Sequence, residues 1–311
     1  MTSTSSAPAA QTVSVKPVVL SAPARGDDLQ VRISAPTSGT DLPVVIFAHG
    51  FGQAMDSHDP LVDHWTAHGF VVIQPTFLDS ATLGLTPTDP RYPDIWRSRV
   101  EDLSRVVDDV DTVLAAVQGL SERVDRNRLA LAGQSWGGQS VGMLLGARVI
   151  GADGETGPSA RDPRIKAGVL LATPGTGGAD LTPFAQENFA FMSPDFTELQ
   201  TPTLVIAGDA DQSPLSTRGS DWFTDVYTLS PGATALLTLT GGQHTLGGIH
   251  GYRSVDTTDE DPARVALVAA ASTAYLKQAL GVDSAPWQQV QTELAATAQP
   301  AGRIESKRIN R

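Results

Sequence analysis

Residues 133–137 read Gly-Gln-Ser-Trp-Gly, and in this segment the residue types and their spacing indicate chemistry most directly. A G-x-S-x-G sequence places a serine on a sharp turn between a strand and a helix, with its hydroxyl exposed. The glycines suit such a turn because a Cβ two positions from the serine would collide with neighbouring backbone. The apolar run 129–132 before the motif and the helix-compatible segment 139–148 after it fit that context. Ser135 is therefore the predicted nucleophile, and the alternative is a surface Gly-Ser turn.

A serine hydroxyl is a poor nucleophile unless an imidazole takes its proton and a carboxylate orients that imidazole. Two apolar, strand-like runs each lead into residues of these types. The run 203–207 is followed by Asp209 and Asp211, and the run 233–239 ends shortly before His244. His244 is the candidate base, and the two aspartates are candidates for the acid.

Other histidines compete with His244 for the role of base. His64 and His68 lie four residues apart on a predicted helix with Asp63 nearby, a spacing that would allow a metal pair. No third ligand is placed by the sequence, and the H-E-x-x-H pattern is absent, so we predict no metal site and no cofactor. His58 and His250 are predicted to be loop residues, and His250 is close enough in sequence to His244 to line the same site.

The elements that must position these residues alternate between strands and helices along the chain. Short apolar runs typical of parallel strands buried on both faces are 43–48, 70–74, 129–132, 167–171, 203–207 and 233–239. Helix-compatible segments are 61–68, 97–117, 137–150, 218–227 and 262–280, the last opened by Asp261 as N-cap. Residues 13–20 and 29–35 predict an antiparallel hairpin at a sheet edge. This alternation predicts an α/β protein with a doubly wound, mostly parallel sheet.

The motif and the strand-end turns together resemble the α/β-hydrolase superfamily over about residues 43–280. The resemblance implies an α/β-hydrolase fold with about eight strands, helices on both faces of the sheet and no large separate lid. The long segments 76–95 and 173–199 follow strand ends and are expected to roof an apolar pocket.

The resemblance also implies the chain order serine, acid, histidine, which Ser135, Asp211 and His244 follow. Asp211 is favoured over Asp209 because the turn 208–214 resembles the G-x-x-D-x-x-P turn of the superfamily, whose second acid accepts the bond from the histidine. Asp209 is then expected to brace the loop.

Residues 48–52, Ala-His-Gly-Phe-Gly, resemble the H-G-x loop that follows the third strand in this superfamily. The backbone N–H groups of Phe51 and Trp136 are therefore expected to form an oxyanion hole. His49 is expected to shape this loop and not to act as the base. Phe51, Trp136 and Leu78 are the expected substrate-binding residues.

Within the superfamily the chain most resembles the branch that contains dienelactone hydrolase, plant chlorophyllase, platelet-activating-factor acetylhydrolase and the bacterial cutinase-like polyester hydrolases. Segments 49–52, 68–75 and 244–252 carry this finer resemblance. Ser135 stands where dienelactone hydrolase has cysteine, and Trp136 stands where the polyester hydrolases have methionine. These departures concern the substrate and not the reaction class.

The composition excludes several classes of partner. The 311 residues carry a formal net charge of −12, which repels nucleic acid and anionic lipid. No apolar stretch approaches the roughly 20 residues that span a bilayer, so membrane insertion is not expected. The absence of cysteine rules out disulfides and a cysteine nucleophile.

Three regions are expected along the chain: a disordered leader 1–14, a hydrolase domain 15–282 and a polar tail 283–311 with a short helical stretch near 287–295. The leader has no signal-peptide pattern as written, which fits a cytoplasmic protein or a secreted one whose leader has been removed. The oligomeric state is not predicted.

These features predict a carboxylic ester hydrolase that works through an acyl-enzyme. The expected substrates are small-molecule or polymeric esters, of short to medium chain or polyester-like. The same three residues could instead act on a lactone, an amide or a C–C bond. A hydrolase fold that only binds a ligand is the non-catalytic alternative.

Overall fold

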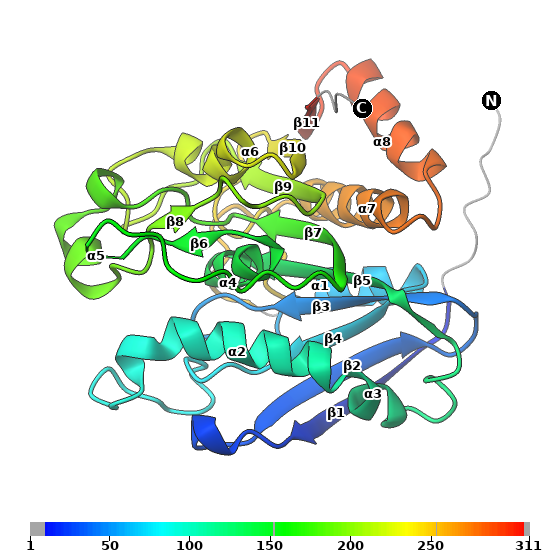
Figure 1. Cartoon of the computed structure of the whole chain (residues 1–311). Coiled ribbons are helices and arrows are strands. Elements are labelled where there is room, and N and C mark those ends of the chain that lie inside the picture. Colours follow the sequence, from blue (N-terminus) through cyan, green and yellow to red (C-terminus); the bar gives the residue numbers. More distant parts are fainter. Residues whose placement is uncertain (1–9, 152, 253, 308–311) are drawn as a thin grey trace.

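The structure, a computed structural model, describes residues 10–151, 153–252 and 254–307. Over these residues the main sheet has nine strands in the order β1-β2-β4-β3-β5-β7-β9-β10-β11 (Figure 1). Six neighbouring strands, from β4 to β10 in that order, run parallel, and antiparallel strands flank them. The strands are β1 (Thr12–Leu20), β2 (Leu29–Pro36), β3 (Leu42–Ala48), β4 (Val71–Pro75), β5 (Val124–Gln134), β7 (Ile165–Leu171), β9 (Thr203–Gly208), β10 (Ala233–Leu239) and β11 (Gly302–Ser306), with a separate pair of β6 (Arg148–Val149) and β8 (Pro194–Asp195).

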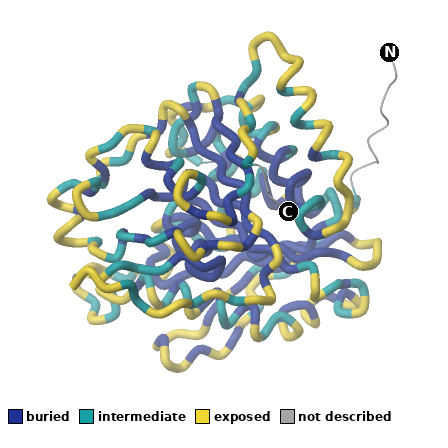
Figure 2. The backbone as a smooth tube through the Cα atoms, turned by 45° about the horizontal axis from the view of Figure 1, so that its top comes forward, coloured by how far each residue is buried: buried dark blue, intermediate teal, exposed yellow. Residues whose placement is uncertain are grey.

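Helices cover both faces of this sheet, which explains why its central strands are apolar without alternation. In β3, Val44 and Ile46 pack with the residues of α2 and α4, whereas Val45 and Phe47 face α1 and α7. The central strands are buried along most of their length (Figure 2). The α-helices are α1 (Asp59–Ala67), α2 (Ile95–Asp108), α3 (Val110–Ala115), α4 (Trp136–Leu145), α5 (Pro183–Asn188), α6 (Asp225–Leu229), α7 (Pro262–Ala279) and α8 (Ala285–Ala296). The 3-10 helices are η1 (Pro23–Arg25), η2 (Tyr92–Asp94), η3 (Gly178–Asp180) and η4 (Ser220–Thr224).

This architecture confirms the predicted α/β-hydrolase fold with its doubly wound, mostly parallel sheet. The predicted hairpin is also confirmed, with Leu20 opposite Leu29 at the sheet edge. Asp261 caps α7 as predicted, because its side chain accepts hydrogen bonds from the N–H groups of Ala263 and Arg264.

One predicted helix is too long at its C-terminal end. The segment 137–150 was expected to be helical throughout, but α4 ends at Leu145. Gly146 follows with φ 125°, a left-handed conformation that favours glycine, and a Cβ there would meet the carbonyl oxygen of Glu198. The chain then leaves the helix axis and forms β6.

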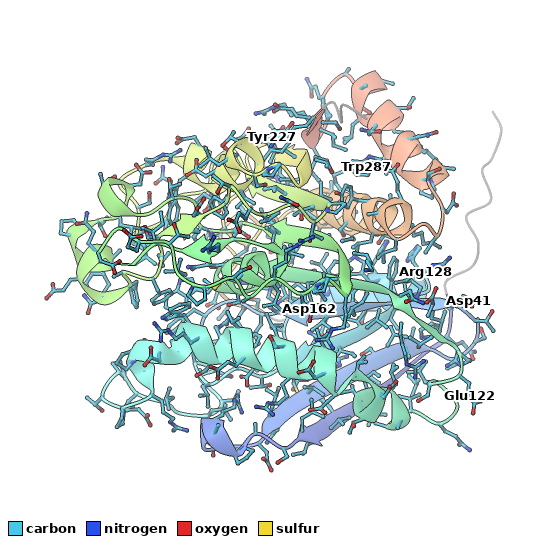
Figure 3. The ribbon with its side chains drawn as sticks, in the orientation of Figure 1. Asp41, Glu122, Arg128, Asp162, Tyr227 and Trp287 are labelled. Atoms are coloured by element: carbon cyan, nitrogen blue, oxygen red, sulfur yellow. The ribbon has the colours of Figure 1, made fainter. Side chains whose placement is uncertain are left out.

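The predicted tail is part of the fold. Helix α8 packs on α7, and Trp287 of α8 lies beside α7 (Figure 3). The ring of Trp287 is 5.2 Å from that of Tyr275. Strand β11 then pairs antiparallel with β10, so the sheet continues to residue 306. Residues 12–14 of the predicted leader belong to β1, and its residues 1–9 lie outside the described residues. Burial of Trp287 and pairing with an open strand edge supply the contacts that a polar composition did not predict.

No helix in the described ranges combines the length and the apolar character needed to cross a bilayer.

Candidate active site

Ser135 lies at the turn between β5 and α4, with φ 54° and ψ −123°. This positive φ is rare for a residue with a side chain, and it directs the hydroxyl out of the sheet edge. The flanking glycines make the turn possible. A Cβ at Gly133 would meet the carbonyl oxygen of Gly137, and a Cβ at Gly137 would meet that of Ala48. The N–H of Ser135 donates to the carbonyl of Leu171, which fixes the turn to β7 at 2.9 Å.

Three residues from separate strand ends meet at this turn. The Ser135 hydroxyl lies 3.0 Å from Nε2 of His244, and Nδ1 of His244 lies 3.0 Å from Oδ2 of Asp211. With Nδ1–H donating to the carboxylate, Nε2 is free to accept the serine proton. Asp211 is fully buried, and this burial raises the pKa of its carboxyl above the ordinary value. The structure thus brings together the serine, the histidine and the favoured aspartate.

Asp209, the other candidate acid, has a different partner. Its Oδ1 accepts a hydrogen bond from the N–H of Gly241 at 2.7 Å. This bond joins the end of β9 to the turn after β10, and the turn carries His244 toward Ser135. Asp209 therefore lies where it can brace the loop.

A buried carboxylate that the sequence analysis missed holds residues 243–247, the loop that carries His244 and is called the histidine loop below. Asp259 accepts hydrogen bonds from the N–H of Gln243 at 2.7 Å, the N–H of Gly247 at 2.9 Å and the hydroxyl of Thr245 at 2.5 Å. These donors lie on either side of His244, so Asp259 fixes the backbone that carries the imidazole. It sits in an acidic run before α7, and nothing in that run distinguishes it from its exposed neighbours.

The loop 49–52 lies across the turn from His244 and is held by a buried ion pair. Arg99 of α2 donates to both carboxylate oxygens of Asp79, at 3.0 and 3.3 Å. Its guanidinium also donates to the carbonyl of His49 at 2.8 and 3.0 Å, and to that of Gly50 at 3.2 Å. Asp79 in turn accepts from the N–H of Gly52 at 3.2 Å. Both charged side chains are almost completely buried, with 1% and 0% exposure.

His49 belongs to the same network. Its Nε2 accepts from the N–H of Phe77 at 3.1 Å, and its Nδ1 lies 2.7 Å from the carbonyl of Gly50, which places the proton on Nδ1. Burial, with the nearby charge of Arg99, lowers the pKa of His49 to about 3. A buried, neutral imidazole with both nitrogens engaged fits the expected role in shaping the loop. Arg99 and Asp79 were not singled out from the sequence, because an arginine on an amphipathic helix is ordinarily a surface residue.

An apolar cleft of about 300 Å³ opens above Ser135 and His244. Phe51 and Trp136 form one wall, with their rings 4.8 Å apart. Among the described residues that line the cleft, His244 is the one ionisable group. The remaining lining residues are apolar or uncharged: Pro174, Phe189, Met192, Gln212, Ser213, Pro214, Leu215, Trp222 and Phe223.

Leu78 does not join Phe51 and Trp136 in this wall. It is 2% exposed and packs in the core beneath α2, and it is not part of the cleft surface. No residue of 76–95 is among the described residues that line the cleft, so this segment does not roof it as the sequence suggested. The other predicted segment, 173–199, supplies Pro174, Phe189 and Met192.

None of the four remaining histidines is among the described residues that line the cleft above Ser135. His64 and His68 stack with ring centroids 3.9 Å apart, and no group of three or more metal-ligating side chains occurs among the described residues. His58 and His250 pack together 5.2 Å apart behind the histidine loop. Burial lowers the pKa of His64 and of His250 to about 4, and it lowers that of His58 well below the ordinary range.

Residues 8–148 match the family model described as chlorophyllase, a family of the α/β-hydrolase superfamily. The matched segment is less than half of the chain. It contains Phe51, Ser135 and Trp136, and it ends before Asp211 and His244. A search of curated proteins finds no match. Fold and family match together place the chain among the α/β hydrolases and indicate an ester hydrolase.

Proposed function

We propose that this protein is a serine hydrolase of carboxylic esters that works through an acyl-enzyme. The observation that carries the proposal is the continuous hydrogen-bonded series from Ser135 through His244 to Asp211, at 3.0 Å for each step. Such a series provides the base that a serine needs and the carboxylate that orients the base. It lies at the edge of the sheet where α/β folds bind ligands.

In the proposed reaction the Ser135 oxygen attacks the ester carbonyl carbon while His244 takes its proton. Asp211 holds the imidazole in the required tautomer and stabilises its charge. The carbonyl oxygen becomes an oxyanion as the C–O bond forms. The collapsing intermediate expels the alcohol, which receives the proton from His244. Water, deprotonated by the same imidazole, then releases the acid and restores the serine.

The N–H groups of Phe51 and Trp136 are the proposed oxyanion donors. Neither N–H has a hydrogen-bond acceptor among the described residues, and each belongs to a residue beside Ser135 in the cleft. Donors that are fixed before the reaction stabilise the developing charge without reorganisation. The buried guanidinium of Arg99 is what fixes the loop that carries Phe51.

The lining of the cleft favours uncharged esters. It offers rings, aliphatic side chains and the neutral polar groups of Gln212 and Ser213, and, apart from His244, no ionisable group among the described residues that line it. A volume of about 300 Å³ suits short to medium acyl chains. Because the cleft is open to solvent, it would also admit one unit of a polyester.

The proposal is tested by covalent labelling and by turnover. A fluorophosphonate probe should label the wild-type protein and fail to label Ser135→Ala, because only an activated serine reacts. On p-nitrophenyl esters Ser135→Ala should lose on the order of 10⁶ in kcat, as expected when a nucleophile acting with its base is removed. His244→Ala should behave in the same way.

Thermal unfolding of each variant supplies the control for folding. A folded Ser135→Ala protein that keeps more than about a hundredth of the wild-type kcat would refute the assignment, since that loss falls far short of a nucleophile knockout. Turnover of lactones and anilides, measured beside the esters, shows which kind of bond the enzyme cleaves. Faster turnover of either class would replace the ester proposal.

A further inference from the structure

A second cavity, of about 490 Å³, lies on the far side of Trp96 from the catalytic cleft and has no part in the proposed reaction. It is bounded by α2, by the C-terminal half of α4 and by residues 149, 151, 153 and 155–160. The buried and half-buried part of its lining is largely apolar and includes Val100, Met143, Ala147 and Val149. Charged side chains of both signs, among them Arg97 and Glu101, are exposed at its rim. This surface suits an uncharged hydrocarbon group, because an ion would find no buried partner in its floor.

The second cavity is nearly continuous with the catalytic cleft. A small cavity of about 10 Å³ lies between them and shares Trp136 with the cleft and Trp96 and Met143 with the second cavity. Trp136, Gln139 and Met143 are spaced three or four residues apart, so they follow one face of α4, and Ala147 lies just beyond the C-terminal end of that helix. At 1.5 Å per residue, Trp136 and Met143 are separated by about 10 Å along the helix. The three cavities thus form a track that begins at Ser135 and runs beside α4.

Two aromatic rings close this track. The ring of Phe191 stacks on that of Trp96 at 5.8 Å and contacts that of Trp136 edge-on at 5.2 Å. Its backbone is anchored, since Gln139 donates to the carbonyl of Phe191 at 3.0 Å. The ring itself is half-buried and is held by aromatic contacts, which lack the directionality of a hydrogen bond. Removing or turning this ring would leave the hydrogen bond that anchors the backbone in place.

We infer that Phe191 and Trp96 set the length of the apolar chain that the enzyme accepts, and that the second cavity holds the far end of a longer chain once Phe191 is removed or turned aside. This inference rests on the proposed ester hydrolysis. With the wall closed, a chain can be buried only within the cleft of about 300 Å³. With the wall open, each further buried methylene raises kcat/KM by up to about fourfold.

The experiment compares esters of increasing chain length in two series. The chain lies on the acyl side in p-nitrophenyl alkanoates and on the alcohol side in alkyl acetates, and each ester is kept at a concentration at which it does not aggregate. In the wild type, kcat/KM should fall from the octyl to the dodecyl chain. In Phe191→Ala, the ratio of dodecyl to butyl kcat/KM should rise by at least about tenfold in one of the two series, as a few buried methylenes would produce. Phe184→Ala is the matched control. Phe184 is in the same segment but is 59% exposed and absent from all three cavities, so this ratio should not change.

A second substitution tests the site of the chain. Val100→Trp fills the second cavity without altering the lining of the catalytic cleft. Added to Phe191→Ala, it should return the ratio to the wild-type value. If Phe191→Ala is unstable, Trp96→Ala opens the same wall and should raise the same ratio. A change in all chain lengths by one factor, or a ratio that Val100→Trp leaves high, overturns the inference. Butyl ester turnover in the wild type reports separately on the proposed function.

Discussion

On one side of Ser135 the loop 49–52 is fixed by a buried guanidinium, a buried carboxylate and the bonds they make to backbone. On the other side the side chains of Phe189 and Phe191 contact Trp136 edge-on at 5.2 Å, and the hydrogen bond from Gln139 holds only the backbone of Phe191. A hydrogen bond to an ion is directional and costly to break once buried, whereas ring contacts of similar energy exist in several orientations.

This difference separates the two tasks of a hydrolase. Reacting atoms must be placed within fractions of an ångström, which directional bonds achieve. A wall that contacts substrate must exclude water and match the shape of the substrate. Aromatic rings do this without fixing one orientation of the side chain. Substitutions on the bonded side should therefore change kcat, and substitutions on the aromatic side should change substrate preference.

The largest of these effects is expected at Asp211, the proposed acid that is hydrogen-bonded to His244. Asp211→Asn should lower kcat by about 10⁴, because an amide favours the wrong tautomer of His244. Asp209→Asn is the matched control and should cost only a small factor, since Asp209 bonds to Gly241 and not to the imidazole. Steady-state kinetics on one p-nitrophenyl ester decide the matter. A larger loss from Asp209→Asn would reverse the assignment.

A smaller effect is expected from the brace of the loop 49–52. Arg99→Lys keeps the charge near Asp79 but loses the planar fork that reaches two carbonyls. We expect kcat to fall by roughly 10- to 100-fold, less than the loss of a whole oxyanion donor, with little change in KM. Arg105→Lys makes the same change on the same helix, where the guanidinium donates to a single carbonyl among the described residues, that of Ser21.

Two measurements accompany the Arg99 variant. Thermal unfolding separates a folded protein with a displaced loop from one that has lost stability through its buried ion pair. A folded Arg99→Lys protein with wild-type kcat would show that aromatic contacts suffice to hold the loop. The contrast between the two sides of the cleft would then fail.

The smallest effect concerns stability. Burial holds the pKa of His49 near 3 and that of His250 near 4, against an ordinary value of 6.5. Below pH 6.5 the unfolded chain therefore binds protons that the folded protein does not, and acid favours unfolding. The free energy of unfolding should fall as the pH is lowered from 6.5, by up to roughly 1.4 kcal/mol per pH unit for fully buried His49.

Urea unfolding at pH 7.5, 6.5 and about 5.5 measures the free energy of unfolding. The fall is expected between pH 6.5 and about 5.5, which lies between the ordinary and the lowered pKa values, and pH 7.5 supplies the reference above them. His250→Asn removes one such group outside the proposed catalytic series and should make the acid slope shallower. A free energy of unfolding that stays constant or increases on acidification would contradict the neutral, buried state of these histidines.

The sequence predicted the meeting of Ser135, Asp211 and His244 because each follows a strand, and parallel strands end at one edge of a sheet. It did not predict Arg99, Asp79 or Asp259. Their role depends on burial and on partners far along the chain, and local patterning carries neither. For Leu78, by contrast, the sequence predicted a role in substrate binding that the structure does not show. An apolar residue after a strand can line a cleft or fill the core, and here the packing of α2 decides for the core.

Strand β11 was missed for a related reason. Residues 302–306, Gly-Arg-Ile-Glu-Ser, alternate weakly, and their extended conformation depends on the open edge of β10. Helix α4 was predicted correctly at its start, where the motif defines it. The end of α4 was predicted too late, because the hydrophobic pattern of the sequence does not mark Gly146 as a helix end. The conformation of Gly146 depends on the nearby backbone of residue 198.

The position of β11 has a consequence for the behaviour of the protein in a crowded solution. An uncovered β10 would present a row of free N–H and C=O groups, which is a template for pairing with another chain. Strand β11 occupies that row and becomes the edge itself, where the exposed charges of Arg303 and Glu305 oppose further pairing. At the opposite edge, β1 contains Lys16 and Pro17 within a break in its register, and proline offers no N–H to a partner. Both rims of the sheet are thus protected against edge-to-edge aggregation.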